Sequence, residues 1–149
     1  MYKKEDIISD LVDQKICRRD EIIGCSPQEV HWLEESFSPL KLPLAYKEFL
    51  LAMGNGAGSF LYFTDIYFPT LDGMQDDAIA MLEEEGEDFN LPDDAIVFSY
   101  ADGHCFSFFR ASEGDDPPVY IYLSGQGYPE PFKPFSENLK FSMRFHVPP

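Results

Sequence analysis

The fold is decided by the stretch LPLAYKEFLLAMGNG at residues 42–56. Pro43 suits the first turn of a helix, and the apolar side chains that follow recur at i, i+3, i+4 and i+7, the spacing of one helix face. These side chains are Tyr46, Phe49, Leu50 and Met53. The run Gly54-Asn55-Gly56 predicts the end of the helix, because glycine readily takes the left-handed conformation common there. We therefore expect a buried central helix that starts at Pro43.

Two further helices are predicted before this stretch. Residues 4–15 place apolar side chains on one helix face. They are Ile7, Ile8, Leu11 and Val12. Ser26-Pro27-Gln28-Glu29 is a capping box with proline at the first helical position, so a second helix is expected to start there. The inner face of this second helix would consist of Val30, Leu33 and Phe37.

The chain is predicted to become strand-rich after the central helix. Residues 60–63 and 66–68 are largely aromatic and flank Thr64-Asp65, which predicts two short strands that stop at Pro69. A helix from Asp72 to about Glu85 is expected next, because apolar side chains again recur at helical spacing. They are Met74, Ala78, Met81 and Leu82.

The remaining residues predict an antiparallel sheet. Residues 96–100 and 105–109 flank Asp102-Gly103, the strongest hairpin signal in the chain. Residues 119–123 alternate aliphatic and tyrosine side chains and predict a third strand of the same meander. A loop rich in glycine and proline is expected at 125–134.

A last helix is predicted from Ser136, and it carries Leu139, Phe141 and Phe145. Helices grouped on one side of an antiparallel meander make an α+β fold. The 149 residues fit one domain, and no internal repeat or long linker divides them.

The charge of the chain restricts its partners. The sequence has 27 acidic and 11 basic side chains, which give a formal net charge of −16. Direct binding to nucleic acid or to anionic membranes is disfavoured, because both need positive charge. A basic protein partner would be attracted instead. The alternative is that the charge only keeps the protein soluble.

The location is predicted from the amino terminus and the cysteines. The first residues are polar and show no apolar segment typical of a secretory signal, and no stretch is long enough to span a bilayer. Cys17, Cys25 and Cys105 are odd in number and lack a C-x-x-C spacing, which suits a reducing compartment. We expect a cytoplasmic protein.

Motifs for catalysis, metals or cofactors are missing from the sequence. His31, His104 and His146 have no metal-ligand spacing, and no G-x-S-x-G or P-loop occurs. The glycines at 54–58 follow a helix and precede a strand, the reverse of a dinucleotide-binding loop. Paired carboxylates at glycosidase spacing remain open, because among 27 acids some pair meets that distance by chance. We expect a protein that is not an enzyme and binds no cofactor or metal.

One acidic stretch is the candidate binding site. Between Lys47 and Arg110 there is no lysine or arginine. Three consecutive glutamates crowd the carboxyl end of the helix predicted at 72–85, where each acid costs about 0.3–1 kcal/mol because of the helix dipole. Solubility does not require that arrangement, whereas a cationic partner would benefit from it. The predicted partner-binding residues are Asp72, Asp76, Asp77, Glu83, Glu84, Glu85, Glu87, Asp88, Asp93 and Asp94.

The central stretch also resembles a known family. Residues 42–50, followed by Gly54-Asn55-Gly56, resemble the L-P-x-x-Y-x-x-F-L … N-G core of the SUKH superfamily, which contains bacterial toxin-immunity proteins and Smi/Knr-like yeast regulators of cell-wall synthesis. The order of the later segments is similar over about residues 26–145. The glycine run departs from the family by continuing to Gly58. The resemblance implies a non-enzymatic α+β domain that binds and blocks a cognate toxin, often a nuclease.

Three hypotheses follow for the function. The first is an immunity protein that neutralises a nuclease toxin through its acidic surface, with an exposed tyrosine or phenylalanine as the apolar anchor. The second is a regulatory scaffold that recruits other proteins. The third is an enzyme or a carbohydrate or small-ligand binder, for which a cleft with converging carboxylates would be needed. The oligomeric state is open, because the aromatic strands offer an edge for pairing.

Overall fold

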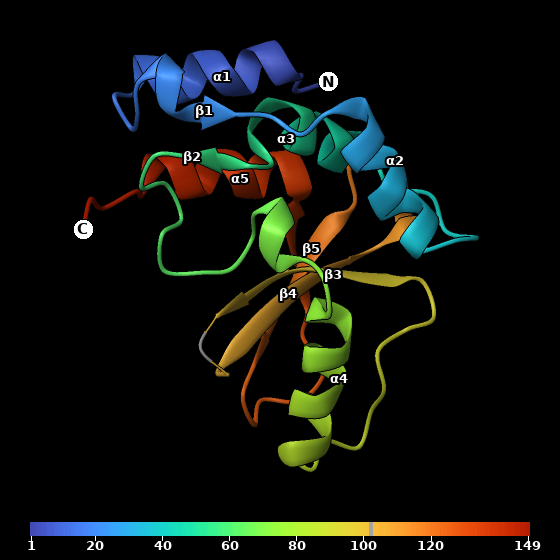
Figure 1. Ribbon diagram of the computed structural model, residues 1–149. Helices are drawn as coiled ribbons and strands as arrows, with labels where there is room; N and C mark the ends of the chain where they lie inside the picture. The colour runs from blue at the N-terminus through green and yellow to red at the C-terminus, as the bar shows by residue number, and fades with distance from the viewer. Residues whose placement is uncertain (102) are drawn as a thin grey trace.

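The structure is a computed structural model that describes residues 1–101 and 103–149. Figure 1 shows the order of the elements along the chain. The helices are α1 (Lys4–Asp13), α2 (Pro27–Ser36), α3 (Leu44–Met53), α4 (Met74–Glu84) and α5 (Phe135–Arg144). The strands are β1 (Ile22–Ile23), β2 (Gly56–Ala57), β3 (Ala95–Ala101), β4 (Cys105–Arg110), β5 (Pro118–Leu123) and β6 (Pro131–Pro134). Short 3₁₀ helices are formed by Arg19–Glu21, Phe68–Thr70 and Ala111–Glu113.

The central helix α3 is confirmed, and all four of its predicted inner side chains are buried. The Tyr46 ring lies 5.1 Å from Phe109 and 5.5 Å from Phe135, so α3 joins the sheet to α5. Gly54 does not adopt the left-handed conformation predicted for the end of the helix, because its φ is −59°. A Cβ at Gly54 would lie 2.4 Å from the Cys25 sulfur, so this glycine permits close packing.

The capping box at Ser26 is confirmed as the start of α2. The Glu29 N–H donates to the Ser26 hydroxyl at 3.1 Å, and the Ser26 N–H donates to the Glu29 carboxylate at 2.9 Å. Val30 and Leu33 are buried and Phe37 is half-buried, as expected for the inner face. This cap fixes the direction in which the outer face of α2 is presented.

The four strands β3 to β6 form an antiparallel meander, as predicted. Their register places two different sets of side chains on the two sides of the sheet. The side next to α4 carries Val97, Tyr100, Phe106, Phe108, Tyr120 and Tyr122. The side next to α5 carries Ile96, Phe98, Ser99, Ser107, Phe109 and Ile121. The two sides therefore differ in polarity: the α4 side is continuously aromatic, whereas the α5 side includes serines.

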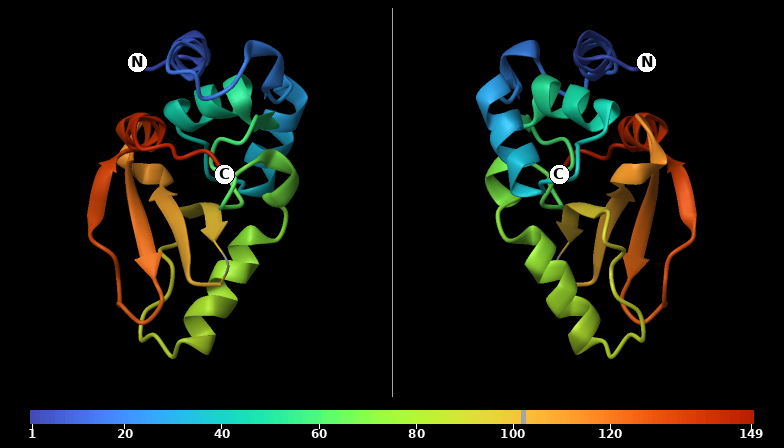
Figure 2. Two further views of the ribbon diagram at one scale, coloured as in Figure 1. Left: turned by 90° about the vertical axis from the view of Figure 1, so that its left-hand side faces the viewer. Right: turned by 90° about the vertical axis from the view of Figure 1, so that its right-hand side faces the viewer.

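The helices are divided between these two sides. Figure 2 shows α1, α2, α3 and α5 gathered at one end of the sheet, while α4 runs along its other side. The α+β class is confirmed. The helices α1, α2, α3 and α5 lie together, as predicted, but α4 lies apart from them. Helix α4 packs separately against β3, because the aromatic α4 side of the sheet needs its own apolar cover.

The structure corrects the strands predicted next to the central helix. Residues 60–63 form turns and residues 68–70 a 3₁₀ helix, and Asp65 forms only an isolated bridge with Tyr100. The aromatic residues of this segment mimic a strand in sequence, but they do not alternate in burial: Phe60 and Leu61 are buried, whereas Tyr62 and Phe63 are exposed. A strand was also missed at 131–134, within the predicted loop, because Pro131 and Pro134 obscure it. The predicted turn residue Asp102 lies outside the described residues.

Both outer strands of the sheet are protected. The Gln75 side chain donates to the Ala95 carbonyl and accepts from the Val97 N–H, both at 2.9 Å, on the free side of β3. The Asp65 backbone pairs with Tyr100 further along the same edge. The opposite edge strand, β6, begins and ends with proline. These contacts and prolines disfavour pairing of either edge with a strand from another molecule, a possibility that the sequence leaves open.

Within the described residues, no helix combines the length and the apolar content needed to cross a membrane.

Candidate functional site

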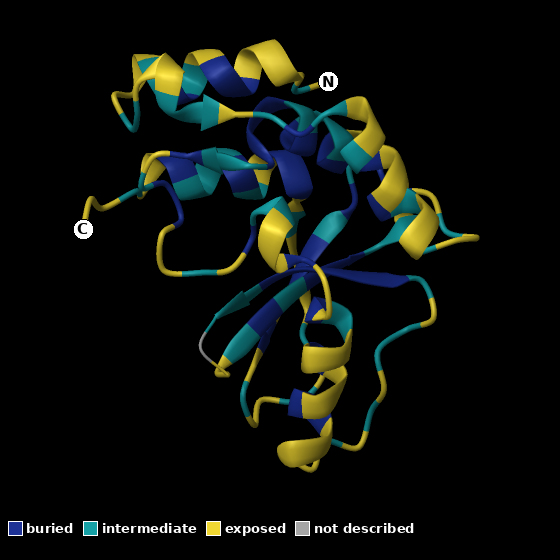
Figure 3. Ribbon diagram, viewed as in Figure 1, coloured by how far each residue is buried: buried dark blue, intermediate teal, exposed yellow. Residues whose placement is uncertain are grey.

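Helix α4 presents four of the ten predicted acidic residues, and the others lie in the segments at its two ends. Met74, Ala78, Met81 and Leu82 are buried against the sheet, as predicted. Helical geometry then turns the intervening acids toward solvent, and Figure 3 shows α4 as a largely exposed helix. Asp76 and Asp77 occupy its first turn, which suits the positive end of the helix dipole. Glu83 and Glu84 lie in its last turn, and no basic residue offsets them there.

Eight of the ten predicted residues are exposed, and we call them the acidic face. They are Asp72, Asp76, Asp77, Glu83, Glu84, Glu85, Asp88 and Asp93. None of the ion pairs between described residues includes any of the eight. Four of them lie on α4, Asp72 precedes it, and Glu85, Asp88 and Asp93 lie between its end and β3.

The other two predicted residues, Glu87 and Asp94, stabilise the fold. The Glu87 carboxylate accepts from the buried Tyr122 hydroxyl at 2.6 Å and from the Gly127 N–H at 3.1 Å. The Asp94 carboxylate accepts from Arg110 Nε at 2.8 Å and from the Ser112 hydroxyl. Partial burial raises the pKa of Asp94, but the hydrogen bonds from Ser112 and Arg110 outweigh it and hold that pKa below its usual range. We do not count these two carboxylates as part of the acidic face, because their hydrogen bonds hold parts of the fold together.

One flank of the acidic face approaches the sheet. Tyr100 of β3 has a raised pKa, chiefly because of its partial burial and then because of the negative charge of Asp77 and Glu84. The spacing of seven residues places Asp77 and Glu84 two helical turns apart on the same flank. These two carboxylates therefore lie near enough to Tyr100 to disfavour its ionisation.

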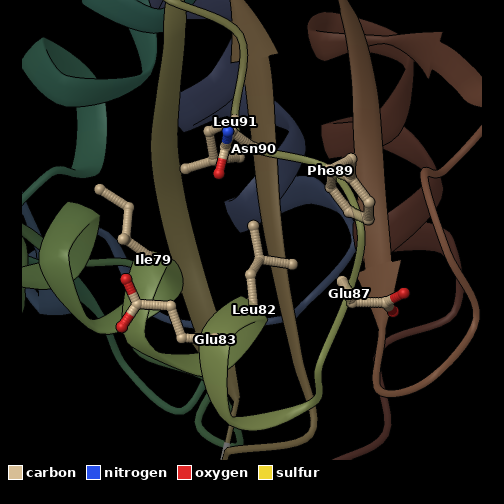
Figure 4. A pocket seen from close by; sticks show the side chains of 7 residues that line it. All are labelled: Ile79, Leu82, Glu83, Glu87, Phe89, Asn90 and Leu91. Atoms are coloured by element: carbon tan, nitrogen blue, oxygen red, sulfur yellow. The ribbon is translucent and has the colours of Figure 1, made fainter.

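The other flank of α4 contains a hollow of about 190 Å³, shown in Figure 4. We call it the α4 hollow. Its lining residues are Ile79, Leu82, Glu83, Glu87, Phe89, Asn90 and Leu91. Leu82 and Leu91 face each other across its centre, and Ile79 and Glu83 stand on one side. This arrangement combines an apolar floor with a carboxylate from the acidic face.

A second hollow, of about 350 Å³, lies where the amino end of α4 meets α2. Asp72 and Asp76 line it together with Trp32, whose side chain is 54% exposed. The sequence predicts a tyrosine or phenylalanine as the apolar anchor, whereas the exposed ring beside these acids belongs to Trp32. A signal was present in the sequence, since Trp32 does not belong to the inner face of α2 formed by Val30, Leu33 and Phe37. The Trp32 ring lies edge-on to Phe68 at 5.8 Å.

Comparison with protein families identifies the fold. The family model described as SMI1-KNR4 cell-wall, SUKH_6, matches residues 28–140, more than two thirds of the chain. The chain belongs to the SUKH superfamily. A comparison with curated proteins finds no significant match.

The residues that carry the SUKH resemblance lie in the core of the domain. Tyr46, Phe49 and Leu50 are buried in α3, and Gly54 packs against Cys25. These positions determine the SUKH fold and contact no exposed surface. Family membership places the chain among Smi1/Knr4-like and immunity-type proteins. The surface residues that select a partner must therefore be sought in this chain itself.

The SUKH domain has a second notable surface, on the α5 side of the sheet. Two adjoining hollows of about 330 and 180 Å³ share Leu61, Phe63, Phe141 and Ser142. We call this surface the apolar face and define it by Leu61, Phe63, Ile121, Phe132, Phe141 and Phe145. Phe63 is 62% and Phe145 61% exposed. The sequence analysis missed it because exposed and buried phenylalanines look alike in a sequence.

The described residues offer little for catalysis. Among residues 1–101 and 103–149, no group of three His, Cys, Asp or Glu side chains is placed to hold a metal ion. The shifted carboxyl pKa values among these residues, those of Glu34 and Asp94, both fall because of ion pairs and hydrogen bonds, although burial opposes the fall. Neither carboxylate lines the hollows described above. A general acid would need a raised pKa and access to a cleft.

Proposed function

We propose that this SUKH domain is an immunity protein that binds a basic protein toxin through the acidic face and thereby neutralises it. The observation that carries the proposal is that α4 and the segments at its two ends hold eight exposed carboxylates, none of which has a cationic partner among the described residues. A toxin that cleaves nucleic acid needs a basic surface to hold phosphates, so an acidic surface of this kind can cover it.

The arrangement on α4 supports a binding role over simple solubility. Glu83, Glu84 and Glu85 crowd the negative end of the helix dipole, where they reduce the stability of α4. Trp32 and Ile79, 54% and 42% exposed, lie beside the acids and supply apolar contact area. Interfaces commonly combine such apolar anchors with complementary charge.

The test is a charge reversal of Asp76, Asp77, Glu83 and Glu84 to lysine. The partner in the assay is the protein encoded next to this chain in its genome, and the readouts are binding and rescue of growth from its toxicity. We expect the reversed protein to lose both. Glu87 is left unchanged, because its reversal would break the hydrogen bond to Tyr122.

The matched control reverses four other exposed acids, Glu5, Asp13, Glu35 and Glu130, and makes the same change in net charge. We expect it to bind and to protect as well as the original chain. Equal effects of the two reversals would mean that only net charge matters, and full binding by both would exclude the acidic face as the interface.

A second candidate function is a regulatory scaffold, and the apolar face favours it. This face lies on the α5 side of the sheet, away from α4, so a partner there would leave the acidic face open (Figure 2). Substitution of Phe63 and Phe145 by serine separates the candidates. A scaffold would lose its recruited protein and give no growth protection with or without the substitutions, whereas an immunity protein that uses the acidic face would keep full protection. Loss of protection with the acidic face intact would place the toxin on the apolar face.

A further inference from the structure

The α4 hollow has the dimensions of a socket for one side chain. Its volume of about 190 Å³ is smaller than the roughly 300–1,000 Å³ of pockets that enclose small-molecule ligands. Ile79, Leu82 and Leu91 make its floor apolar, and Ile79 is 42% exposed. An extended side chain with an apolar stem would bury its methylene groups there.

The charge at the rim of the hollow is negative and lacks a cation. Glu83 is exposed and belongs to none of the ion pairs between described residues. The Glu87 carboxylate is turned away from the centre of the hollow, toward β5, where Tyr122 and Gly127 bind it (Figure 4). Glu87 therefore adds a fixed negative charge, whereas Glu83 is available to a ligand.

The aromatic wall of the hollow is held rigidly. The Phe89 ring lies edge-on to Tyr122 at 6.0 Å and to Tyr128 at 5.2 Å, and Tyr122 is itself buried. Phe89 therefore forms a fixed wall on the side of the hollow opposite Glu83 (Figure 4). The amide oxygen of Asn90 adds a hydrogen-bond acceptor at the same rim.

We propose that the α4 hollow binds an arginine side chain of a protein partner. The guanidinium pairs with the Glu83 carboxylate, and the methylene stem lies on Ile79 and Leu82, which stand on the same side of the hollow or at its centre (Figure 4). Arginine fits better than lysine, because its planar group bonds a carboxylate through two parallel N–H groups. This inference rests on the proposed function, since it names the contact by which a basic partner docks on the acidic face.

The experiment is a titration of the ¹⁵N-labelled protein with N-acetylarginine amide, followed by NMR. N-acetylcitrulline amide, which has nearly the same shape and no charge, is the control ligand. We expect saturable shifts confined to the amides of residues 79–91 with the arginine probe and no saturable shifts with citrulline. Equal shifts from both probes, or arginine shifts spread over the whole acidic face, would overturn the proposal.

Two neighbouring variants distinguish the hollow from the general field. Glu83→Gln and Glu84→Gln remove the same charge from adjacent exposed positions, but only Glu83 lines the hollow. We expect Glu83→Gln to weaken arginine binding about three- to fivefold and Glu84→Gln to weaken it less than about 1.5-fold. Equal weakening would show that only the field acts, and would reject the socket.

The arginine socket and the proposed function can be contradicted separately. If arginine does not bind in the hollow while the charge-reversed protein still loses its partner, the socket is wrong and the acidic interface stands. If arginine binds as expected while partner binding survives charge reversal, the socket stands as a site and the proposed function is wrong.

Discussion

The acidic face and the apolar face lie on opposite sides of the same sheet and are built in contrasting ways. On the α4 side, the apolar underside of α4 packs on β3, and Phe89 and Tyr128 from the following loops cover the aromatic side chains of β4 and β5, so the outer surface of α4 is free to carry charge. On the α5 side, α3 and α5 cover only one end of the sheet, and Ser99, Ser107 and Ile121 open into a hollow. The acidic face offers long-range electrostatic attraction, whereas the apolar face offers contact area that stabilises a complex only after the partners meet.

Salt dependence separates these two modes with the largest expected effect. If the acidic face recognises the partner, raising salt from about 0.05 to 0.5 M should reduce the association rate at least tenfold, because screening removes electrostatic steering. The dissociation rate should change much less. Stopped-flow or surface plasmon resonance measures both rates. An association rate independent of salt would favour the apolar face.

Glu87 and Asp88 separate structural from binding acids within one segment. Glu87→Ala removes the acceptor of the buried Tyr122 hydroxyl and should cost about 1–3 kcal/mol of unfolding free energy. Asp88→Ala, next to it and exposed, should change stability by less than about 0.5 kcal/mol. Urea denaturation of both variants provides the comparison. Similar losses from the two would mean that the Tyr122 contact does not stabilise the protein.

The stabilisation that Asp94 provides is expected to depend on pH. Asp94→Asn should cost about 1 kcal/mol at pH 7, a discounted value because the paired Arg110 is 38% exposed. The folded pKa of Asp94 lies below its unfolded value, so its stabilisation is complete above about pH 4 and is lost as the pH falls through the folded pKa. The difference from the original chain should therefore shrink toward pH 2, in urea denaturation at a series of pH values. Asp93→Asn, which removes one carboxylate from an exposed position, is the control for the change in charge.

Glu85→Lys tests whether the acidic face reduces stability. Glu85 caps the carboxyl end of α4, where the helix dipole disfavours an acid and favours a base. We expect the variant to be about 0.3–1 kcal/mol more stable than the original chain in thermal or urea denaturation, and to bind the basic partner more weakly. If the variant gains no stability, the glutamates do not destabilise α4, and their position no longer supports a binding role.

Phe63 and Phe145 should show the smallest effect on stability. Both are about 60% exposed, so the double substitution by serine should change the unfolding free energy by less than about 0.5 kcal/mol. It should reduce binding of a hydrophobic dye such as ANS, because the apolar face loses two of its exposed rings. A loss of several kcal/mol would instead place these rings in the core.

The two faces also differ in how far the sequence predicts them. The charge pattern predicted the acidic stretch, because a long run without lysine or arginine stays acidic however it folds, and eight of its ten predicted carboxylates are exposed. Helical spacing predicted α3 and α4 with their buried residues, and the Ser26 capping box predicted the start of α2. The sequence could not separate Glu87 and Asp94 from the other acids, because their partners Tyr122 and Arg110 are distant in the chain.

The apolar face was not predictable for a physical reason. Phe63 and Phe60 are alike in sequence, and only the tertiary fold decides that one is exposed and the other buried. In the same way, the alternation at 119–123 predicted a strand but not its orientation. The structure buries Tyr120 and Tyr122 on the α4 side and exposes Ile121 and Leu123. Segments of mixed aromatic character need the packing of the whole domain before their inner face is known.

Hydrogen–deuterium exchange of the complex with the neighbouring gene product locates the interface without any substitution. Binding through the acidic face should slow exchange in α4 and residues 85–91, with little change in residues 60–66 and α5. Protection confined to residues 60–66 and α5 would rule out the acidic face as the interface.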